Sequence, residues 1–206
     1  STTGTGTEGT DYATVSDITI LAGATTGTTS FTPTDDAIFE GSETGIIAIA
    51  TVSGGGATEN STPQAVTLTI TNDDSAPTTT LTSSASSIAE NAGSSLTLTA
   101  TLSNPTTADV TVGISTSGTG TEGADYGTVS DITILAGATT GTASFTPTDD
   151  STFEGNETAI IAIASVSGGS ATESGTQTVT IAINEDDSGP SLRINDVTTS
   201  NENAAN

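Results

Sequence analysis

The sequence predicts an all-β protein made of antiparallel β-sandwiches, and three observations lead to that fold class. Short stretches of alternating apolar and polar residues are separated by Gly, Asp and Pro, without the period of a helix. Thr, Ser, Gly, Ala, Val and Ile dominate the composition, and β-branched residues suit the pleat of a strand. A long unit also recurs along the chain, so several sandwiches are expected end to end.

The repeat has a spacing of 114 positions between Asp35 and Asp149, and of 113 positions between Asp73 and Asp186. A third copy begins at Pro190. A unit of this length is a domain rather than one rung of a solenoid. The expected organisation is a repeat over residues 1–75 that lacks its N-terminal strands, a complete repeat over residues 76–188, and the start of a third over residues 189–206.

The complete repeat begins with three expected strands. Residues 78–82 form a first edge segment. Residues 94–103 alternate, with Leu98 and Leu102 among the apolar residues of one face, and residues 110–114 continue this pattern. These strands are each expected to bury one face against a second sheet.

Four further strands are expected over residues 132–134, 143–145, 157–166 and 179–183. The stretch 157–166 is apolar on both faces, which predicts a central strand. Seven strands of this kind predict a Greek-key, immunoglobulin-like sandwich.

All aromatic residues occupy equivalent positions in the two longer copies, so each copy is expected to build the same small core around them. They are Tyr12, Phe31 and Phe39 in the first copy and Tyr126, Phe145 and Phe153 in the second.

Composition excludes several functions. The 206 residues carry a formal net charge of -24 and one basic side chain, Arg193. Nucleic acid and anionic membranes are therefore poor partners, because both are bound through Lys and Arg clusters. No apolar run is long enough to insert into a membrane. Cys and His are absent, which removes disulfides, zinc ligation and the usual general base, and no enzyme is expected.

Most acidic residues of the complete repeat fall between strands, at four places in the sequence. These are Glu90, Asp125, the stretch 149–157 and the stretch 185–187. If the strands alternate in direction, these loops share one end of the unit. Neighbouring carboxylates repel one another, so a counter-charge is expected there, and Ca²⁺ suits a site rich in carboxylate oxygens. The rival interpretation is an acidic surface that provides solubility or adaptation to high salt.

The joint pattern of these motifs resembles the Calx-beta domain. The motifs are Ala89-Glu90-Asn91-Ala92-Gly93, Gly123-Ala124-Asp125-Tyr126, the Asp-Asp-x-x-Phe-Glu-Gly-x-Glu run over residues 149–157, and the acidic triplet 185–187. This family is known from the cytoplasmic regulatory loop of sodium/calcium exchangers and from tandem arrays in large bacterial surface proteins. The resemblance implies seven-stranded sandwiches that bind Ca²⁺ at the end where the chain leaves each domain.

The resemblance also implies a set of Ca²⁺ ligands in each copy. In the complete repeat they are Glu90, Asp125, Asp149, Asp150, Glu154, Glu157, Glu185, Asp186 and Asp187. In the first copy they are Asp11, Asp35, Asp36, Glu40, Glu43, Asp73 and Asp74. The first copy has Asn72 where the second has Glu185, so it is expected to bind fewer ions or to bind them more weakly.

The preferred functional hypothesis is a calcium-binding structural segment of a large extracellular bacterial adhesin or filament. Its expected location is outside the cell or on the cell surface, and its expected partners are neighbouring repeats and other copies in a filament. Short linkers at residues 75–77 and 188–190 favour a rod whose joints are stiffened by Ca²⁺. Two alternatives remain: a Ca²⁺-sensing regulatory module that acts on a partner or transporter, and a carbohydrate- or ice-binding surface protein.

Overall fold

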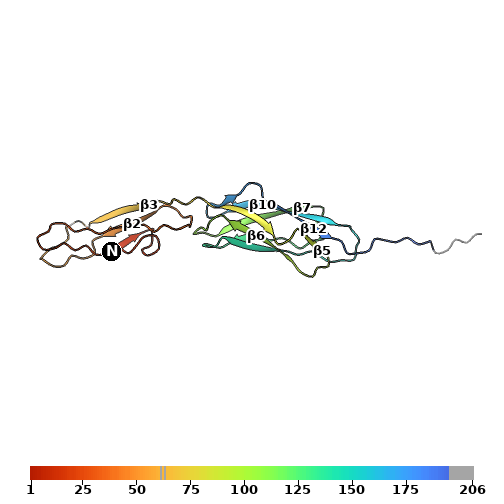
Figure 1. The fold of residues 1–206 in the computed structure, drawn as a ribbon, viewed down its shortest axis with the longest axis horizontal. Helices are drawn as coiled ribbons and strands as arrows, with labels where there is room; N and C mark the ends of the chain where they lie inside the picture. Colours follow the sequence, from red (N-terminus) through yellow and green to blue (C-terminus); the bar gives the residue numbers. More distant parts are fainter. Residues whose placement is uncertain (61, 63, 195–206) are drawn as a thin grey trace, which may run out of the picture.

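The computed structural model describes residues 1–60, 62 and 64–194. Two β-rich units lie end to end along the long axis of the molecule, and an extended segment leaves the second unit (Figure 1). The described residues form strands and no helix, and hence none that could span a membrane. The all-β fold class and the tandem arrangement predicted from the sequence are confirmed.

The second unit is a sandwich of two sheets. One sheet has the strand order β5-β12-β10-β7-β8, and the other has the order β11-β4-β6-β9. The bounds of the first sheet are Ser87–Ala89 for β5, Thr178–Asn184 for β12, Glu157–Ser167 for β10, Val110–Gly118 for β7 and Ile132–Ile134 for β8. Those of the second are Thr172–Glu173 for β11, Thr78–Ser83 for β4, Leu96–Leu102 for β6 and Thr140–Phe145 for β9.

Strand pairing follows the expected pattern with two additions. β10 is central and pairs antiparallel with β7 and β12, as its two apolar faces predict. The short strands β5 and β11 pair in parallel with β12 and β4 at sheet edges, which the sequence did not predict. A bulge between Ile163 and Ser165 shifts the register of β10 against β7.

The core lies between the two sheets. Leu98 and Ala100 of β6 belong to the same buried cluster as Ile161 of β10 and Ile181 of β12, and all four are fully buried. Alternation in each strand thus sends one set of side chains into the interior. Complete burial of one such aliphatic side chain stabilises the fold by about 1.5–3 kcal/mol relative to exposure.

The first unit has one sheet among its described residues, in the order β1-β2-β3. The strands are Thr2–Gly4 for β1, Glu43–Ala48 for β2 and Ala65–Ile70 for β3, and both pairs are antiparallel. They correspond to parts of β7, β10 and β12 of the second unit. Residues 189–194, expected to open a third repeat, contain no strand, and residues 195–206 lie outside the described residues.

The prediction of a shared aromatic core is right for four rings and wrong for Phe153. Tyr126 packs on Phe145 with ring centroids 4.9 Å apart, and Tyr12 packs on Phe31 at 4.7 Å. Phe153 is 50 % exposed. It lies in the acidic loop ahead of β10, outside the two sheets, because the run of carboxylates around it keeps that loop in solvent.

Candidate metal centre

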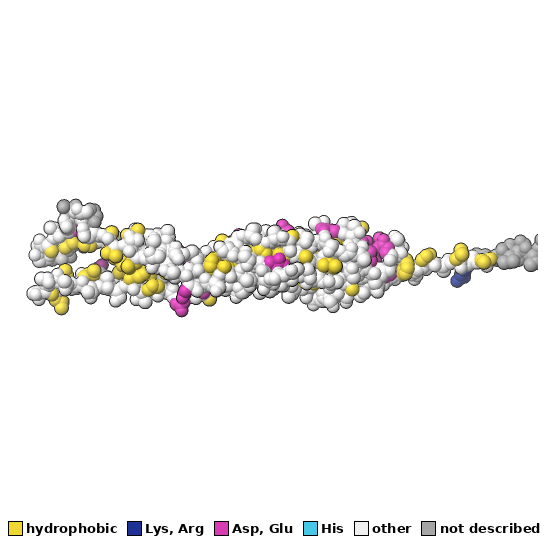
Figure 2. Space-filling model, turned by 90° about the horizontal axis from the view of Figure 1, so that it is seen from above, with side chains coloured by type: hydrophobic (Ala, Val, Ile, Leu, Met, Phe, Trp, Pro, Cys, Tyr) yellow, Lys and Arg dark blue, Asp and Glu magenta, His cyan; other side chains and the backbone are white. Residues whose placement is uncertain are grey.

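The acidic loops of the second unit meet at the end from which the chain leaves it (Figure 2). Glu90 follows β5, Asp125 lies in the loop after β7, residues 149–156 precede β10, and residues 185–187 follow β12. Carboxylate oxygens of Asp125, Glu154 and Glu157 lie within 4.8 Å of one another, and so do those of Glu90, Glu185 and Asp186. We call these the inner and outer triads of the second unit.

A tight turn and a strand hold the inner triad in place. The amide of Asp125 donates to the carbonyl of Thr121 at 2.9 Å, and the amide of Thr121 donates to Asp125 Oδ2 at 2.5 Å. Glu157 opens β10, where it pairs with Ile183 of β12. Burial raises the pKa of both Glu154 and Glu157, and the charge of Asp125 raises each further. The inner triad therefore favours a proton or a cation.

Glu90 and Glu185 of the outer triad also organise the loops. Glu185 Oε2 accepts the amide hydrogens of Glu154 at 2.6 Å and Gly155 at 2.7 Å, and its Oε1 accepts that of Asp187 at 2.8 Å. These bonds lower the pKa of Glu185, so this carboxylate stays charged. Glu90 is only 8 % exposed, and burial raises its pKa. The second unit thus contains one carboxylate whose pKa is lowered by hydrogen bonds, and several whose pKa is raised by burial and neighbouring charges.

A divalent cation fits this donor set. Asp187 Oδ2 is buried and has no hydrogen-bond partner, and burial together with the charges of Asp186 and Glu185 raises the pKa of Asp187. An unpaired buried carboxylate oxygen is costly unless a cation compensates it. The only basic side chain of the sequence, Arg193, lies in the exposed segment beyond the unit. A metal ion is therefore the simplest compensating charge, and its ligands would be hard oxygens.

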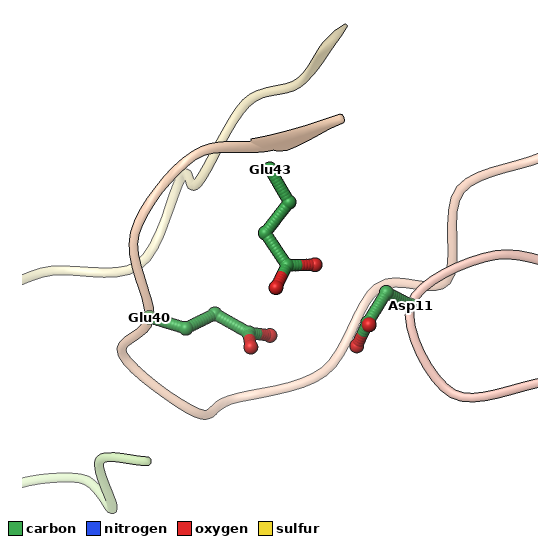
Figure 3. A group of neighbouring side chains, drawn as sticks. All are labelled: Asp11, Glu40 and Glu43. Atoms are coloured by element: carbon green, nitrogen blue, oxygen red, sulfur yellow. The ribbon is translucent and has the colours of Figure 1, made fainter. Parts of the chain in front are cut away.

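The first unit forms the same acidic end with one triad. Asp11, Glu40 and Glu43 have carboxylate oxygens within 4.8 Å of one another and point toward a common centre (Figure 3). The amide of Thr34 donates to the carbonyl of Asp11 at 3.0 Å, as Thr148 does to Asp125 at 2.9 Å. The local scaffold of this end is thus the same in both units.

A cavity at this end of the first unit contains the other predicted acids. Its acidic lining consists of Asp11, Asp35, Asp36, Glu40, Glu43, Asp73 and Asp74. Burial raises the pKa of Glu40, Glu43 and Asp74, and neighbouring carboxylates add to each shift. Asn72 stands at the position of Glu185 and donates from Nδ2 to the carbonyl of Asp74 at 3.2 Å. An amide thus replaces one carboxylate of the set.

Comparison with family models identifies this arrangement. The Calx-beta domain model matches residues 1–74 and again residues 72–187. The chain belongs to the Calx-beta domain family. Its two Calx-beta matches cover both units described above, including the acidic end of each.

Solved structures that are similar to this chain include two from Calx. The apo-form Calx CBD1 domain is 18 % identical, covers 53 % of this chain and 99 % of its own length, and gives a TM-score of 0.45. CBD12 from CALX1.2 is also 18 % identical, covers 89 % of this chain and 92 % of its own length, and gives a TM-score of 0.45. A search of curated proteins found no match.

The predicted ligands of the second Calx-beta unit all lie at this end, but not all of them belong to a triad. Six of them form the two triads. Asp150 Oδ1 accepts the amide hydrogen of Thr152 at 2.6 Å, and Asp149 lies near enough to raise the pKa of Asp187. The assignment of each carboxylate as a ligand remains a prediction.

Two neutral side chains support the site and were not predicted. Asn91 donates from Nδ2 to Asp186, and Asn156 Oδ1 accepts the amide hydrogen of Glu185 at 3.0 Å. Asn91 could have been found, because a Glu-Asn pair also occurs at Glu202 at the start of the third copy. Asn156 offers no such signal, since the first unit has Ser42 at that position.

Proposed function

We propose that the chain is a calcium-binding structural segment of a large extracellular bacterial adhesin or filament. Ca²⁺ binds at the acidic end of each unit and stiffens the joint to the next unit. Membership of the Calx-beta family and the carboxylate triads support the ion, and the tandem arrangement supports the structural role. A non-enzymatic role is consistent with this family membership.

The donor chemistry favours Ca²⁺ over Mg²⁺. Ca²⁺ accepts six to eight oxygen ligands in flexible geometry, whereas Mg²⁺ retains several waters and uses few protein carboxylates. In the second unit, Asp125, Glu154 and Glu157 would hold one ion, and Glu90 and Asp186 would contribute to another. Glu185 orients the loop that carries Glu154 through its two amide contacts. Bound Ca²⁺ would compensate the negative charge of these carboxylates.

One observation carries the stiffening role: the acidic loop of the first unit is bonded to the second unit. The amide of Phe39 donates to the carbonyl of Pro105 at 2.9 Å, and Phe39 forms a parallel bridge with Thr106. Phe39 stands next to Glu40 and three residues after Asp36. The loop that would bind the ion therefore also touches the neighbouring unit.

The linker adds one further bond at the same joint, because Asn104 Nδ2 donates to the carbonyl of Ser75 at 3.0 Å. The amide of Thr78, the first residue of β4, donates to Ser103 Oγ at 3.0 Å and fixes the start of the second unit. Pro77 is fully buried, and β4 begins at the next residue. Almost no free chain remains between the units, so fixing the Phe39 loop limits how far they can swing.

Small-angle scattering with Ca²⁺, Mg²⁺ or chelator tests this function. We expect the maximum dimension to be sharply defined in Ca²⁺ and to spread on chelation. Phe39→Pro removes the amide hydrogen that Pro105 accepts and should broaden the distribution even in Ca²⁺. Phe153→Pro is the matched control, because it makes the same change at the equivalent position of the second unit. Identical profiles with and without Ca²⁺ would contradict the stiffening role.

A further inference from the structure

Glu185 differs from the other predicted ligands of the second unit in what its carboxylate already binds. Its Oε2 accepts the amide hydrogens of Glu154 at 2.6 Å and Gly155 at 2.7 Å, and its Oε1 accepts that of Asp187 at 2.8 Å. A carboxylate offers about four lone-pair positions, and these amides occupy most of them. Little capacity therefore remains at Glu185 for a metal ion.

Other predicted ligands that accept amide hydrogens do so through one oxygen. Asp125 accepts an amide through Oδ2 at 2.5 Å, Asp150 accepts one through Oδ1 at 2.6 Å, and Glu90 accepts a distant one through Oε1 at 3.4 Å. Each keeps a second oxygen that no amide of the described residues occupies. These three carboxylates can still face an ion, whereas both oxygens of Glu185 are engaged by the protein.

The amide bonds of Glu185 join two acidic loops. One oxygen holds the turn ahead of β10, and the other holds the segment that follows β12. The amides of Asp187, Glu154 and Gly155 lower the pKa of Glu185, so it remains a charged and strong acceptor. Because Glu154 lies in the turn ahead of β10, the position of one inner-triad carboxylate depends on Glu185.

The first unit has the same turn sequence but no equivalent acceptor. Asn72 stands at the position of Glu185, and its Nδ2 donates to a carbonyl two residues further on at 3.2 Å. Among the described residues, the amides of Glu40 and Gly41 form no hydrogen bond. The backbone also differs, because Gly155 has a φ of +83° and Gly41 lies outside the left-handed region. Both turns read Phe-Glu-Gly, so their own residues do not explain this difference.

We infer that Glu185 is a positioning residue that preforms the calcium site of the second unit and is not itself an ion ligand. The inference rests on the proposed function, because it concerns the same site. Glu185 holds the Glu154 turn in place ahead of ion binding, which lowers the conformational cost of binding. In the first unit the turn is ordered only as the ion binds, so the fraction of molecules with a competent turn reduces the apparent affinity.

Calcium titration of the full chain, followed through the amide NMR signal of Gly155, tests this inference. Glu185→Gln keeps an oxygen for the turn amides and loses the charge, so affinity should fall by less than about threefold. Glu185→Ala removes the acceptor and should lower affinity by about tenfold. Glu157→Gln is the matched change at an inner-triad ligand and should cost roughly tenfold or more.

Calorimetry of the same variants counts the bound ions. Glu185→Ala should bind as many ions as the unaltered chain, because a positioning residue supplies no ligand. The inference would be overturned by a loss in Glu185→Gln as large as that in Glu157→Gln, or by fewer ions bound to Glu185→Ala.

Amide hydrogen exchange in chelator tests the positioning role without calcium. The amides of Glu154 and Gly155 should exchange about tenfold more slowly than those of Glu40 and Gly41. Glu185→Ala should remove this difference, because it removes the acceptor. Equal exchange in the two turns of the unaltered chain would contradict the inference.

The reverse change can be made in the first unit. Asn72→Glu supplies the missing acceptor and should slow exchange at Glu40 and Gly41 by about tenfold. Asn72→Asp is the matched control, because it adds the same charge on a side chain one methylene shorter, and it should leave exchange unchanged. Equal slowing by both variants, or by neither, would overturn the inference. Absence of calcium binding by the unaltered chain, with the exchange difference intact, would instead reject the proposed function and keep the positioning role.

Discussion

The two units contain an identical stretch of eleven residues that adopts different structures. Residues 17–27 and residues 131–141 have the same sequence. In the second unit this stretch contains β8 and the start of β9, and in the first unit it contains no strand. The difference lies in the partners: β8 pairs with residues 110–112, whereas residues 18–20 pair with no strand among the described residues. Strand formation here depends on cross-strand packing more than on local preference.

The acidic ends differ less than the sandwiches do. Both units form the Thr-to-Asp bond beside the inner carboxylates, and both contain a triad of one Asp and two Glu residues. The turns that carry Asp11 and Asp125 are closed by bonds to Thr7 and Thr121, four residues earlier, so they do not depend on the second sheet. Among the described residues the second unit has a further triad of Glu90, Glu185 and Asp186, and the first unit has Asn72 at the position of Glu185.

The largest contrast is expected from the same substitution in the two copies. Ile132→Ala should destabilise the second unit by about 2–5 kcal/mol, because it leaves a cavity in a closed core. Ile18→Ala should change stability by less than about 0.5 kcal/mol, because this side chain is already exposed. Urea unfolding followed by Tyr126 fluorescence in a Tyr12→Phe background measures the second unit, and Tyr126→Phe allows the same for the first. Equal effects would contradict the difference in packing.

Calcium should stabilise the second unit more than the first. With a dissociation constant near 10⁻⁴ to 10⁻³ M, millimolar Ca²⁺ adds about 0.4–1.4 kcal/mol, and roughly hundredfold saturation adds about 2.7 kcal/mol. The second unit has two triads and the first has one, so its gain should be larger. Thermal unfolding with the same pair of tyrosine reporters measures each gain. A larger effect of Mg²⁺ than of Ca²⁺ would count against the proposed ion.

Removing one inner carboxylate should have opposite effects in the two metal states. Glu157→Gln takes away a ligand charge, so Ca²⁺ affinity should fall by roughly tenfold or more. The metal-free protein should become no less stable, because repulsion with Asp125 and Glu154 is relieved. Glu43→Gln is the matched change in the first unit. Clear destabilisation of the metal-free second unit would show that Glu157 maintains the fold through hydrogen bonds instead.

The smallest expected effect is a reversal of pH dependence on adding Ca²⁺. The carboxyl groups with raised pKa are Glu40, Glu43, Asp74, Glu90, Glu154, Glu157 and Asp187. Above the ordinary pKa, the folded protein binds more protons than the unfolded chain at these groups, so metal-free stability falls as pH rises through the folded-state values. Acidification from about pH 7 to about pH 5 should therefore stabilise the metal-free protein.

Two groups oppose this trend, but at lower pH. A hydrogen bond from Thr2 lowers the pKa of Glu8, and amide bonds lower that of Glu185. Their contribution is lost only as pH falls through their depressed folded-state values. With Ca²⁺ bound, protons compete with the ion, and the same acidification should destabilise the protein. Urea midpoints at the two pH values, with Ca²⁺ and with chelator, would show whether acidification raises or lowers stability in each state. A change in the same direction with Ca²⁺ and with chelator would contradict the prediction.

The sequence predicted the strands of the second unit because its alternation is regular. Leu98, Ala100 and Leu102 recur at every second position, and each is buried. The short strands β5 and β11 were missed, since segments of three and two residues contain too little alternation to detect. The local sequence could not predict that residues 17–31 of the first unit form no strand, because the equivalent residues form β8 and β9 in the second unit.

The position of the site could be predicted, but not the role of each residue. Acids placed between strands indicated one common end, and the triads lie there. Sequence spacing could not show that Glu185 serves as an amide acceptor, because this depends on how the loop before β10 folds over it. The exposure of Phe153 was missed for the related reason that an aromatic residue beside a strand usually packs in the core.

Calorimetric titration with Ca²⁺ tests the central claim most directly, because it measures ion binding without assuming a mechanical role. The account predicts saturable binding in the range of about 10⁻⁴ to 10⁻³ M, with more ions per chain than one and a lower stoichiometry after Glu154→Gln together with Glu157→Gln. The same pair of changes at Glu40 and Glu43 should remove the contribution of the first unit. Absence of saturable binding up to about 10 mM Ca²⁺ would contradict the assignment of these acidic ends as calcium sites.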